Sequence, residues 1–347
     1  MVSSKAFNGP AAETWNTNLV KDPKLDVAIR GTGVAAYCSA LLLDRAGVPV
    51  ALEQSERARV PAIMIGAATQ ALIADIFGRT DLFNGLHRID KRVVAWGASA
   101  EPQTLPHSAV VISEEQLLKR LRPAFTNASL ANPQWTIYAS RPLPPAAVEH
   151  RFGSRTAQAI SVRIKDHADP ATCWIESVEN GWLFLIPHSP GEGWLLSVGH
   201  APLDSSRIIA AQIATANLAA AEFPAYLRIL HPLGDAGWLA CGTAAMVFDP
   251  LCGDGTGNAV REAILAAAVI RASGPMEDVL EHYRRRLLAG FLRHLDQCRQ
   301  FYLRGHSTDW WRSELQQILT GMNWCQAQVG DHRQFRYRLR DFDLERI

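Results

Sequence analysis

A strand–helix–strand pattern marks the first regular structure along the chain. The run 25–29, LDVAI, is apolar apart from Asp26, which is typical of a buried strand. An Ala- and Leu-rich stretch then predicts a helix that ends at Gly47, and a second apolar run, 48–53, ends in Glu53. The pattern therefore predicts two buried strands joined by a helix.

The middle of the chain has a mixed pattern. Trp182 and Phe184 are two positions apart on one expected strand and so share a face, as core residues or as walls of a pocket. Helices are expected at 67–77 and 114–121, and alternating runs predict antiparallel strands at 157–166, 172–180, 181–188 and 193–200.

The last third of the chain is predicted to be mainly helical. The segment FDPLCGDGTGNAVREAILAAAVI, 248–270, places three glycines before a buried helix, with Asn258 as the expected N-cap. Further helices are expected from 276, and the alternating end of the chain is compatible with a closing strand. The basic residues of the run 284–304 indicate either a solvated helix face or a docking surface for an acidic partner.

Composition narrows the class of protein. The chain has 347 residues, 48% of them hydrophobic, and a net charge of +1, which gives no general attraction to nucleic acid or membrane. Its six cysteines are scattered without a Cys-x-x-Cys pair, which argues for reduced thiols and against a metal site. No apolar run is long enough to span a bilayer. We therefore expect a cytoplasmic protein with no metal, no nucleic-acid partner and no membrane span.

The first strand–helix junction has the spacing of a dinucleotide-binding turn. In G-x-G-x-x-A, Gly31 permits the tight turn, Gly33 lets a pyrophosphate approach the backbone, and Ala36 allows close helix–strand packing. Glu53 follows at the end of the second strand, where an acidic side chain binds ribose hydroxyls. An acid there favours FAD or NAD over NADP.

The second glycine-rich segment completes a two-part FAD site. A helix start offers unpaired N–H groups and partial positive charge, which suit an electron-rich ring. The first motif would hold the ADP half, and the second would cover the ribityl chain and flavin. The residues expected in this second element are Asp249, Pro250, Gly253, Gly255, Thr256, Gly257 and Asn258.

These motifs resemble the FAD-dependent aromatic monooxygenases, in particular their tryptophan-halogenase-like branch. The segment 238–267 is similar to the second FAD motif of that superfamily, and 180–200 is similar to the Trp-x-Trp-x-Ile-Pro signature of halogenases. The segments 59–78 and 294–315 also resemble halogenase-like regions. The resemblance implies an α/β fold: a Rossmann-type FAD-binding domain, an inserted antiparallel-sheet substrate domain and a helical C-terminal part.

We expect the chain to divide accordingly. The FAD-binding domain would be discontinuous, formed by 24–60 and 236–275 with helices of 61–135. The substrate-sheet domain would cover 136–235, and a mainly helical C-terminal segment would cover 276–347.

The sequence departs from the halogenase pattern at key positions. Arg88 stands where the resemblance places the halogenase lysine, with Lys91 nearby, and Cys252 replaces the glutamate after Asp-Pro-Leu. Thr243 replaces the usual ribityl-binding Asp, and Ser113-Glu114 stand where an Arg often precedes a helix. The resemblance therefore implies weakened FAD contacts and makes halogenation the less favoured activity.

The expected function is hydroxylation of an indole- or phenol-like substrate, free or in a peptide, by an FAD-dependent monooxygenase through a flavin C4a-hydroperoxide. NAD(P)H or reduced flavin would supply electrons, and a separate flavin reductase would be a partner in the second case. The alternatives are a flavin-dependent dehydrogenase or reductase and a degenerate flavin-binding partner protein. No residue is identified as a catalytic base; the pocket candidates are Trp182, Phe184, His188, Arg88 and Cys252.

Overall fold

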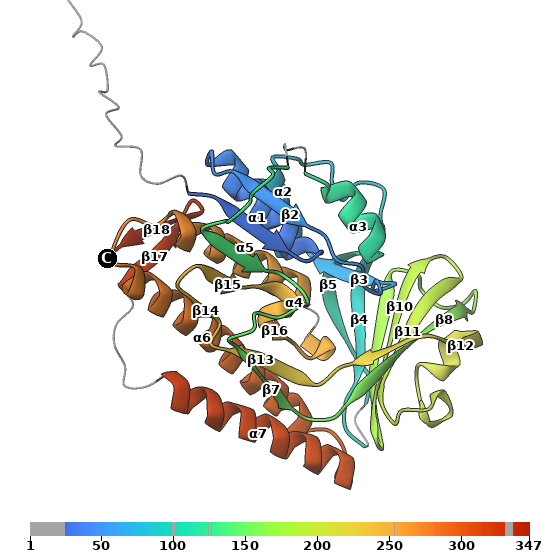
Figure 1. The fold of residues 1–347 in the computed structure, drawn as a ribbon. Coiled ribbons are helices and arrows are strands. Elements are labelled where there is room, and N and C mark those ends of the chain that lie inside the picture. Colours follow the sequence, from blue (N-terminus) through green and yellow to red (C-terminus); the bar gives the residue numbers. More distant parts are fainter. Residues whose placement is uncertain (1–24, 99–100, 124, 126, 253, 330–335) are drawn as a thin grey trace, which may run out of the picture.

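The two strands of the strand–helix–strand unit lie at one edge of a five-stranded sheet (Figure 1). The computed structural model describes residues 25–98, 101–123, 125, 127–252, 254–329 and 336–347. β1 pairs in parallel with β2 and with β6, and β15 pairs in parallel with β6. The strand order is β14 (Gly234–Asp235), β15 (Trp238–Ala240), β6 (Trp135–Tyr138), β1 (Val27–Arg30) and β2 (Val50–Glu53).

Apolar helices cover this parallel sheet. α1 (Val34–Arg45) is buried on nearly all sides, as expected for a helix with apolar residues around its whole circumference. It contacts α2 (Ala67–Phe77) and α5 (Gly255–Arg271). α3 (Glu114–Leu121) begins at Ser113, whose hydroxyl accepts the Gln116 N–H. The predicted bounds of α2 and α3 are both confirmed.

A larger sheet of eight strands stands beside the parallel one (Figure 1). Its strands pair antiparallel except for β4 and β9, which are parallel. Its order is β12 (Ile213–Pro224), β8 (Thr156–Ile164), β11 (Glu192–Gly199), β10 (Gly181–Ser189), β9 (Thr172–Val178), β4 (His87–Ala95), β5 (Gln103–Ile112) and β3 (Ile63–Gly66).

The region 61–135 contributes strands as well as the expected helices. β3, β4 and β5 come from this region and extend the larger sheet, because β4 pairs with β9 on its other edge. β6 and β14–β15 lie at the two ends of 136–235 and belong to the parallel sheet. Strands of the expected FAD-binding domain and of the expected substrate-sheet domain therefore share sheets. The expected division of the chain into these domains stays a prediction.

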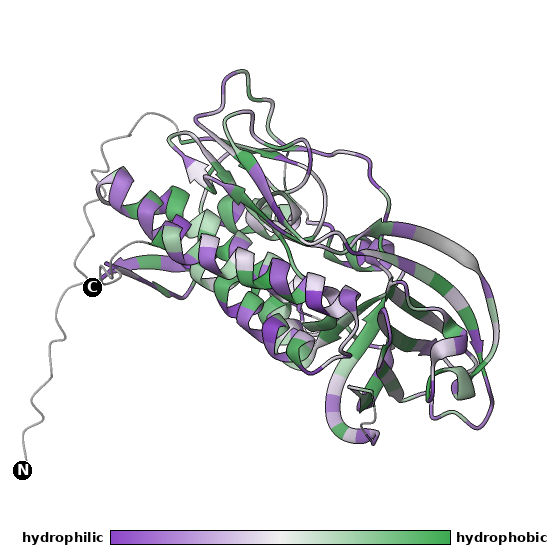
Figure 2. Cartoon of the chain, turned by 90° about the horizontal axis from the view of Figure 1, so that it is seen from below, coloured by the Kyte–Doolittle hydropathy of each residue, from purple (hydrophilic) through white to green (hydrophobic). Residues whose placement is uncertain are grey.

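The larger sheet buries both faces. Phe184 and Ile186 face the main core, and the neighbouring Leu183 and Leu185 pack into a second core with Ile209. Figure 2 shows hydrophobic residues (green) along the long strands, with hydrophilic residues (purple) between them. Short 3-10 helices, Leu203–Ser205 and Ala210–Gln212, belong to the segment that closes the second core.

The C-terminal part is mainly helical, as predicted. α6 (Met276–Leu303) and α7 (Asp309–Val329) pack together, and α7 contacts β7 (Figure 1). Arg284 and Arg299 on α6 pair with acidic side chains, so this basic run is partly neutralised within the chain. The remaining elements are α4 (Gly242–Ala245), the 3-10 turn Pro250–Cys252, the small sheet of β7 (Val148–Phe152), β13 (Leu227–His231) and β16 (Met246–Val247), and the hairpin β17 (Tyr337–Arg340) with β18 (Asp343–Arg346).

The predicted start of α5 is corrected by the structure. The helix begins at Gly255 with Asp254 as its N-cap residue, and the Asn258 N–H already donates to the Asp254 carbonyl at 2.9 Å. Asn258 therefore lies in the first turn, and its side chain accepts from Arg261. Within the described residues, no helix is long and apolar enough to cross a bilayer.

Candidate active site

The G-x-G turn is shaped by the loop that follows β6. Gly31 and Gly33 have φ of +117° and +133°, a region that favours glycine. A Cβ on Gly31 would lie 2.3 Å from Ser140 Oγ, so this position excludes a side chain on steric grounds as well. The Thr32 N–H donates to the same hydroxyl at 3.2 Å. Ala36 is fully buried, in agreement with close packing of α1.

The start of α1 is left uncapped by side chains. Gly33 is its N-cap residue, no side chain accepts from its first N–H groups, and its first turn carries no acid. A helix end of this kind has unpaired N–H donors and partial positive charge. It is therefore suited to an anionic group such as a phosphate.

Glu53 ends β2 beside this turn. Its carbonyl accepts the Gly31 N–H at 2.9 Å, and its carboxylate, 53% exposed, accepts from Arg30 Nε at 2.9 Å. The exposed carboxylate has further acceptor sites, so it can hold Arg30 and a ribose hydroxyl together.

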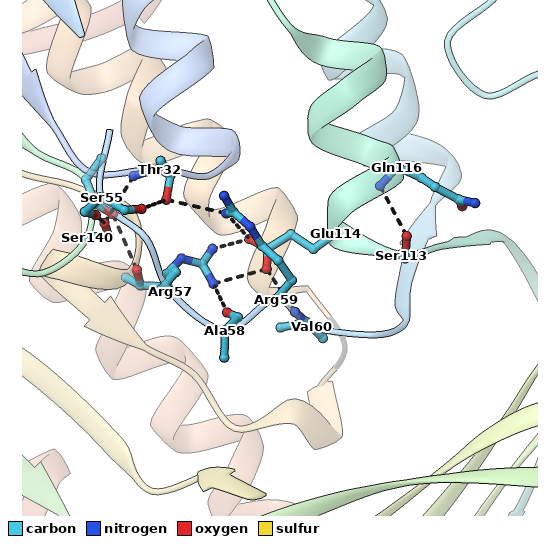
Figure 3. Close-up of polar contacts among 12 residues, drawn as sticks. Thr32, Ser55, Arg57, Ala58, Arg59, Val60, Ser113, Glu114, Gln116 and Ser140 are labelled. Carbon is cyan, nitrogen blue, oxygen red and sulfur yellow. Dashed lines mark hydrogen bonds and ion pairs between the residues drawn. The ribbon is translucent and has the colours of Figure 1, made fainter. Parts of the chain in front are cut away.

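Two arginines that sequence analysis did not select lie over the turn (Figure 3). Arg57 Nη2 lies 3.4 Å from the point that a Cβ on Gly33 would occupy, and Arg59 Nη1 lies 3.4 Å from Thr32 Oγ1. Both contact the buried carboxylate of Glu114, which also accepts the Val60 N–H at 3.0 Å. In the sequence, these arginines are marked only by their position four and six residues after Glu53.

The second glycine-rich element also leaves space at a helix start. A Cβ on Gly255 would meet nothing within 4 Å, and the α5 N-cap residue makes no side-chain capping bond. A Cβ on Gly257 would lie 2.5 Å from Thr69 Oγ1, so this glycine allows α2 to approach. Thr69 donates to Asp254 Oδ1 at 3.3 Å. The predicted residue Gly253 lies outside the described residues.

The carboxylate of Asp249 is bound inside the protein. Its Oδ2 accepts from Tyr302 at 2.8 Å and lies 3.2 Å from Arg155 Nη2, and its Oδ1 accepts the Leu251 N–H at 2.9 Å. Arg155 also pairs with Glu314, and both arginine and aspartate side chains are fully buried. The side chain of Asp249 therefore anchors the turn before α5 to α6 and α7.

Trp182 belongs to the same buried network. Its indole N–H donates to the Tyr302 hydroxyl at 3.3 Å, and the side chain is fully buried. The sequence left open whether Trp182 is a core residue or the wall of a pocket, and in the structure it is a core residue.

A cavity of about 260 Å³ lies between the larger sheet and the start of α5. Phe184 and Ile186 of β10 form one wall, and Pro250, Gly255 and Thr256 form part of another. The other lining residues are mostly apolar and include Val60, Met64, Ala159, Trp194, Leu196, Phe223 and Phe248.

His188 and Arg88 lie outside that cavity. His188 lines an adjoining hollow with His87, which shares Trp194 with the apolar cavity, and burial lowers the pKa of His188 below its usual value. Arg88 is exposed on β4, and Lys91 is exposed and pairs with Asp169 at 3.3 Å. Arg88, which the resemblance aligns with the halogenase lysine, and the nearby Lys91 therefore do not line the apolar cavity.

Cys252 lines a second cavity of about 370 Å³ next to the Pro250 turn. The basic residue Arg92 shares this cavity, although the sequence pattern pointed to Arg88. The other residues around it are Leu251, Gln297, Gln300, Phe301 and Arg304.

The fold is shared with solved flavin-dependent halogenases and hydroxylases, in agreement with the fold that the sequence resemblance implied. Among solved structures, the chain is similar to CmlS, a flavin-dependent halogenase, with a TM-score of 0.71 and 18% identity over 88% of this chain and 70% of that one. It is similar to the myxobacterial chondrochloren halogenase CndH, with a TM-score of 0.71 and 17% identity over 88% and 90%.

A hydroxylase shares the fold as well. The peptidyl tryptophan dihydroxylase QhpG aligns with a TM-score of 0.66 and 16% identity, over 94% of this chain and 86% of that one. No protein-family model and no curated protein sequence matches the chain. The comparisons thus define the fold, and the reaction that the protein catalyses depends on the residues around the two cavities.

Proposed function

We propose that this chain is an FAD-dependent monooxygenase that hydroxylates an aromatic substrate, free or carried by a peptide. The observation that carries the proposal is the apolar cavity between Phe184 and the start of α5. It places an aromatic-lined space directly against the glycine-rich helix start that would cover a flavin ring.

The residues present fit FAD. The turn Gly31–Gly33, the exposed carboxylate of Glu53 and the two arginines over the turn provide contacts for the ADP half. Gly255 leaves open space at an uncapped helix start for the flavin half. FAD, when bound, would supply the activated oxygen for insertion into the substrate. NAD(P)H or a reduced flavin from a separate reductase would supply the electrons.

The cavity itself favours a small neutral ring. Its volume of about 260 Å³ is slightly below the roughly 300–1,000 Å³ of most ligand pockets, and the acidic residue that lines it, Asp249, has its carboxylate bound by Arg155 and Tyr302. The chain's own contribution is therefore to orient an apolar ring through Phe184 and Ile186 and to exclude water. QhpG acts on peptidyl tryptophan by its name, and a crystallised Klebsiella pneumoniae HpxO holds FAD and uric acid.

Hydroxylation is favoured over halogenation by the positions of the basic residues. Arg88 and Lys91 are exposed, and Cys252 stands where the halogenase pattern has a glutamate. A halogenase-type acid and base pair is therefore missing from the cavity that holds Phe184.

The test is a flavin titration followed by rapid mixing with oxygen. Purified protein is titrated with FAD, the complex is reduced without oxygen, and absorbance is followed after oxygen is added, with and without indole, phenol or tryptophan peptides. We expect saturable binding, a transient absorbance distinct from reduced and oxidised flavin, and a product that gains one oxygen atom.

The alternative functions give different results. Failure to bind FAD would contradict the proposal and favour a degenerate partner protein. Bound FAD that passes electrons to an acceptor, with no oxygenated product from any substrate, would favour a dehydrogenase or reductase.

A further inference from the structure

Two cysteines and a histidine meet beside the Pro250 turn. Cys252 Sγ lies 4.0 Å from Cys298 Sγ, and Cys298 Sγ lies 3.4 Å from His294 Nε2. His294 and Cys298 are one turn apart on α6, and Cys252 ends the 3-10 turn before α5. The pair thus joins two elements that are far apart in the sequence.

The two thiols differ in access. Cys252 is half-buried in the wall of the second cavity, which also contains Arg92 and Arg304, whereas Cys298 is fully buried. A partly accessible thiol in basic surroundings is the usual setting of a reactive cysteine. The other four cysteines of the chain are buried elsewhere.

The proton distribution agrees with this division. The Cys298 thiol donates toward Cys252 and, with His294, lowers the pKa of Cys252 to about 6 against the effect of burial. Burial, followed by that hydrogen bond, raises the pKa of Cys298 well above its ordinary value. Cys252 is therefore the more acidic of the two thiols.

A bound metal ion is disfavoured by the direction of the histidine lone pair. His294 Nε2 accepts the Asp249 backbone N–H at 2.9 Å, so its lone pair is directed at that donor. The three side-chain atoms lie within 4.8 Å of one another, but a metal ligand would have to break this hydrogen bond. The arrangement therefore fits a dithiol better than a metal centre.

We propose that Cys252 and Cys298 are a peroxide-oxidisable pair that closes a disulfide. In the first step the Cys252 thiolate attacks a hydroperoxide, a sulfur–oxygen bond forms, the oxygen–oxygen bond breaks, and the leaving oxygen takes a proton. With hydrogen peroxide the products are a sulfenic acid and water, so that sulfur loses two electrons and the peroxide gains them.

In the second step Cys298 attacks the sulfur of Cys252. The sulfur–sulfur bond forms, the sulfur–oxygen bond breaks, and hydroxide leaves as water with the Cys298 proton. The two sulfur atoms need to approach from 4.0 Å to about 2.05 Å. The net change is two thiols and one peroxide to one disulfide and two waters.

The bond would tie the Pro250 turn to α6. That turn lines both cavities, since Pro250 belongs to the apolar one and Leu251 and Cys252 to the second. On the proposed function, reduced flavin that reacts with oxygen without substrate would release hydrogen peroxide beside this pair. The disulfide would then form when reduced flavin consumes oxygen without oxidising a substrate.

The experiment uses the purified full chain and added hydrogen peroxide, so it is independent of bound flavin. Oxidised and untreated protein are alkylated under denaturing conditions, and non-reduced peptides are mapped by mass spectrometry. We expect two fewer alkylated thiols after oxidation, a Cys252–Cys298 cross-linked peptide, and restoration by dithiothreitol. In Cys298→Ala we expect a sulfenic acid at Cys252 that dimedone traps.

Cys325→Ala, a buried cysteine on α7, is the matched control and should still form the cross-link. Over-oxidation of Cys252 without a cross-link in the wild-type protein, or alkylation of both thiols after peroxide treatment, would overturn the proposal. Stoichiometric zinc in the purified wild-type protein that is lost in Cys252→Ser would overturn it as well.

Discussion

Glu114 holds Arg57 over the turn at Gly33, and through this contact a buried carboxylate positions a cation at the start of α1. The sequence suggested a loss of charge at this place, because Ser113-Glu114 stand where an Arg is frequent. The structure instead places two arginines and one carboxylate there, which leaves a net positive cluster (Figure 3). The expectation of weak FAD binding on this ground is therefore not supported by the local charges.

Removing this cation should weaken FAD binding. For Arg57→Ala we expect the Kd for FAD to rise about 10- to 100-fold, since a charge-assisted hydrogen bond contributes about 1.5–3 kcal/mol. Quenching of FAD fluorescence on titration measures the change. Arg79→Ala, an exposed arginine paired with Asp81, serves as the control. An unchanged Kd in Arg57→Ala would show that the guanidinium does not contact the cofactor.

The buried pair of Arg155 and Asp249 should matter for stability. Arg155→Ala leaves the carboxylates of Asp249 and Glu314 without their cation, and we expect a loss of about 3–5 kcal/mol in the free energy of unfolding. Urea unfolding followed by tryptophan fluorescence measures it. Arg312→Ala removes an exposed ion pair with Asp309 and should leave the midpoint unchanged. A similarly small effect in both variants would contradict the anchoring role.

Filling the apolar cavity should separate substrate binding from cofactor binding. Ala159 of β8 lines the cavity, and Ala159→Phe places a ring in the space proposed for the substrate. We expect product formation to fall more than about tenfold while the Kd for FAD stays the same. Product analysis and FAD titration of the same preparation test this. Unaltered turnover would place the substrate elsewhere.

The rate at which Cys252 reacts with electrophiles should depend on pH with a midpoint near its lowered pKa. Its pKa is lowered to about 6, so its rate of alkylation by iodoacetamide should fall as pH decreases through 6 and be nearly constant above 7. In Cys298→Ala the midpoint should move upward, because the thiol that donates to it is lost. The groups that face Cys252 are Cys298, His294 and Asp249, with Arg92 and Arg304 in the same cavity. A midpoint near that of an ordinary thiol would contradict this assignment.

Glu262 predicts a pH dependence of stability. Burial raises its pKa to about 8, although its carboxylate accepts the Gly242 N–H at 2.7 Å. The folded state thus keeps a proton that the unfolded state releases, and this contribution to stability is largest below about pH 4.5 and is lost as pH rises to about 8. Glu262→Gln should reduce the decrease of the unfolding free energy across that range. An identical slope in both proteins would exclude Glu262 as its source.

The sequence predicts local elements better than it predicts long-range contacts. The bounds of α2 and α3 follow from neighbouring residues, such as the left-handed Gly78 at the end of α2 and the capping Ser113 before α3. The G-x-G turn is likewise encoded within a few residues. The contact between Arg155 and Asp249 depends instead on how the larger sheet docks on α6 and α7, which no local pattern contains.

Two details of the site depend on the same kind of non-local information. Arg88 and Arg92 lie on β4 with a register shift between Ile89 and Lys91, and Arg92 rather than Arg88 lines the cavity that contains Cys252. Asn258 is a favourable N-cap by type, yet Asp254 holds that position because the helix begins inside the glycine-rich segment.

The parallel pairing of β4 with β9 also limits how the molecule can move. In sequence, β6 lies between β3–β5 and β8–β12. Because β6 belongs to the parallel sheet and the other strands to the larger sheet, the chain passes between the two sheets more than once. A hinge needs a small number of bendable connections, and here several connections would have to bend together. The distance between the Phe184 wall and the Gly255 wall is therefore set by the framework, and we expect ligands to exchange through side-chain and loop movements rather than by opening of one half against the other.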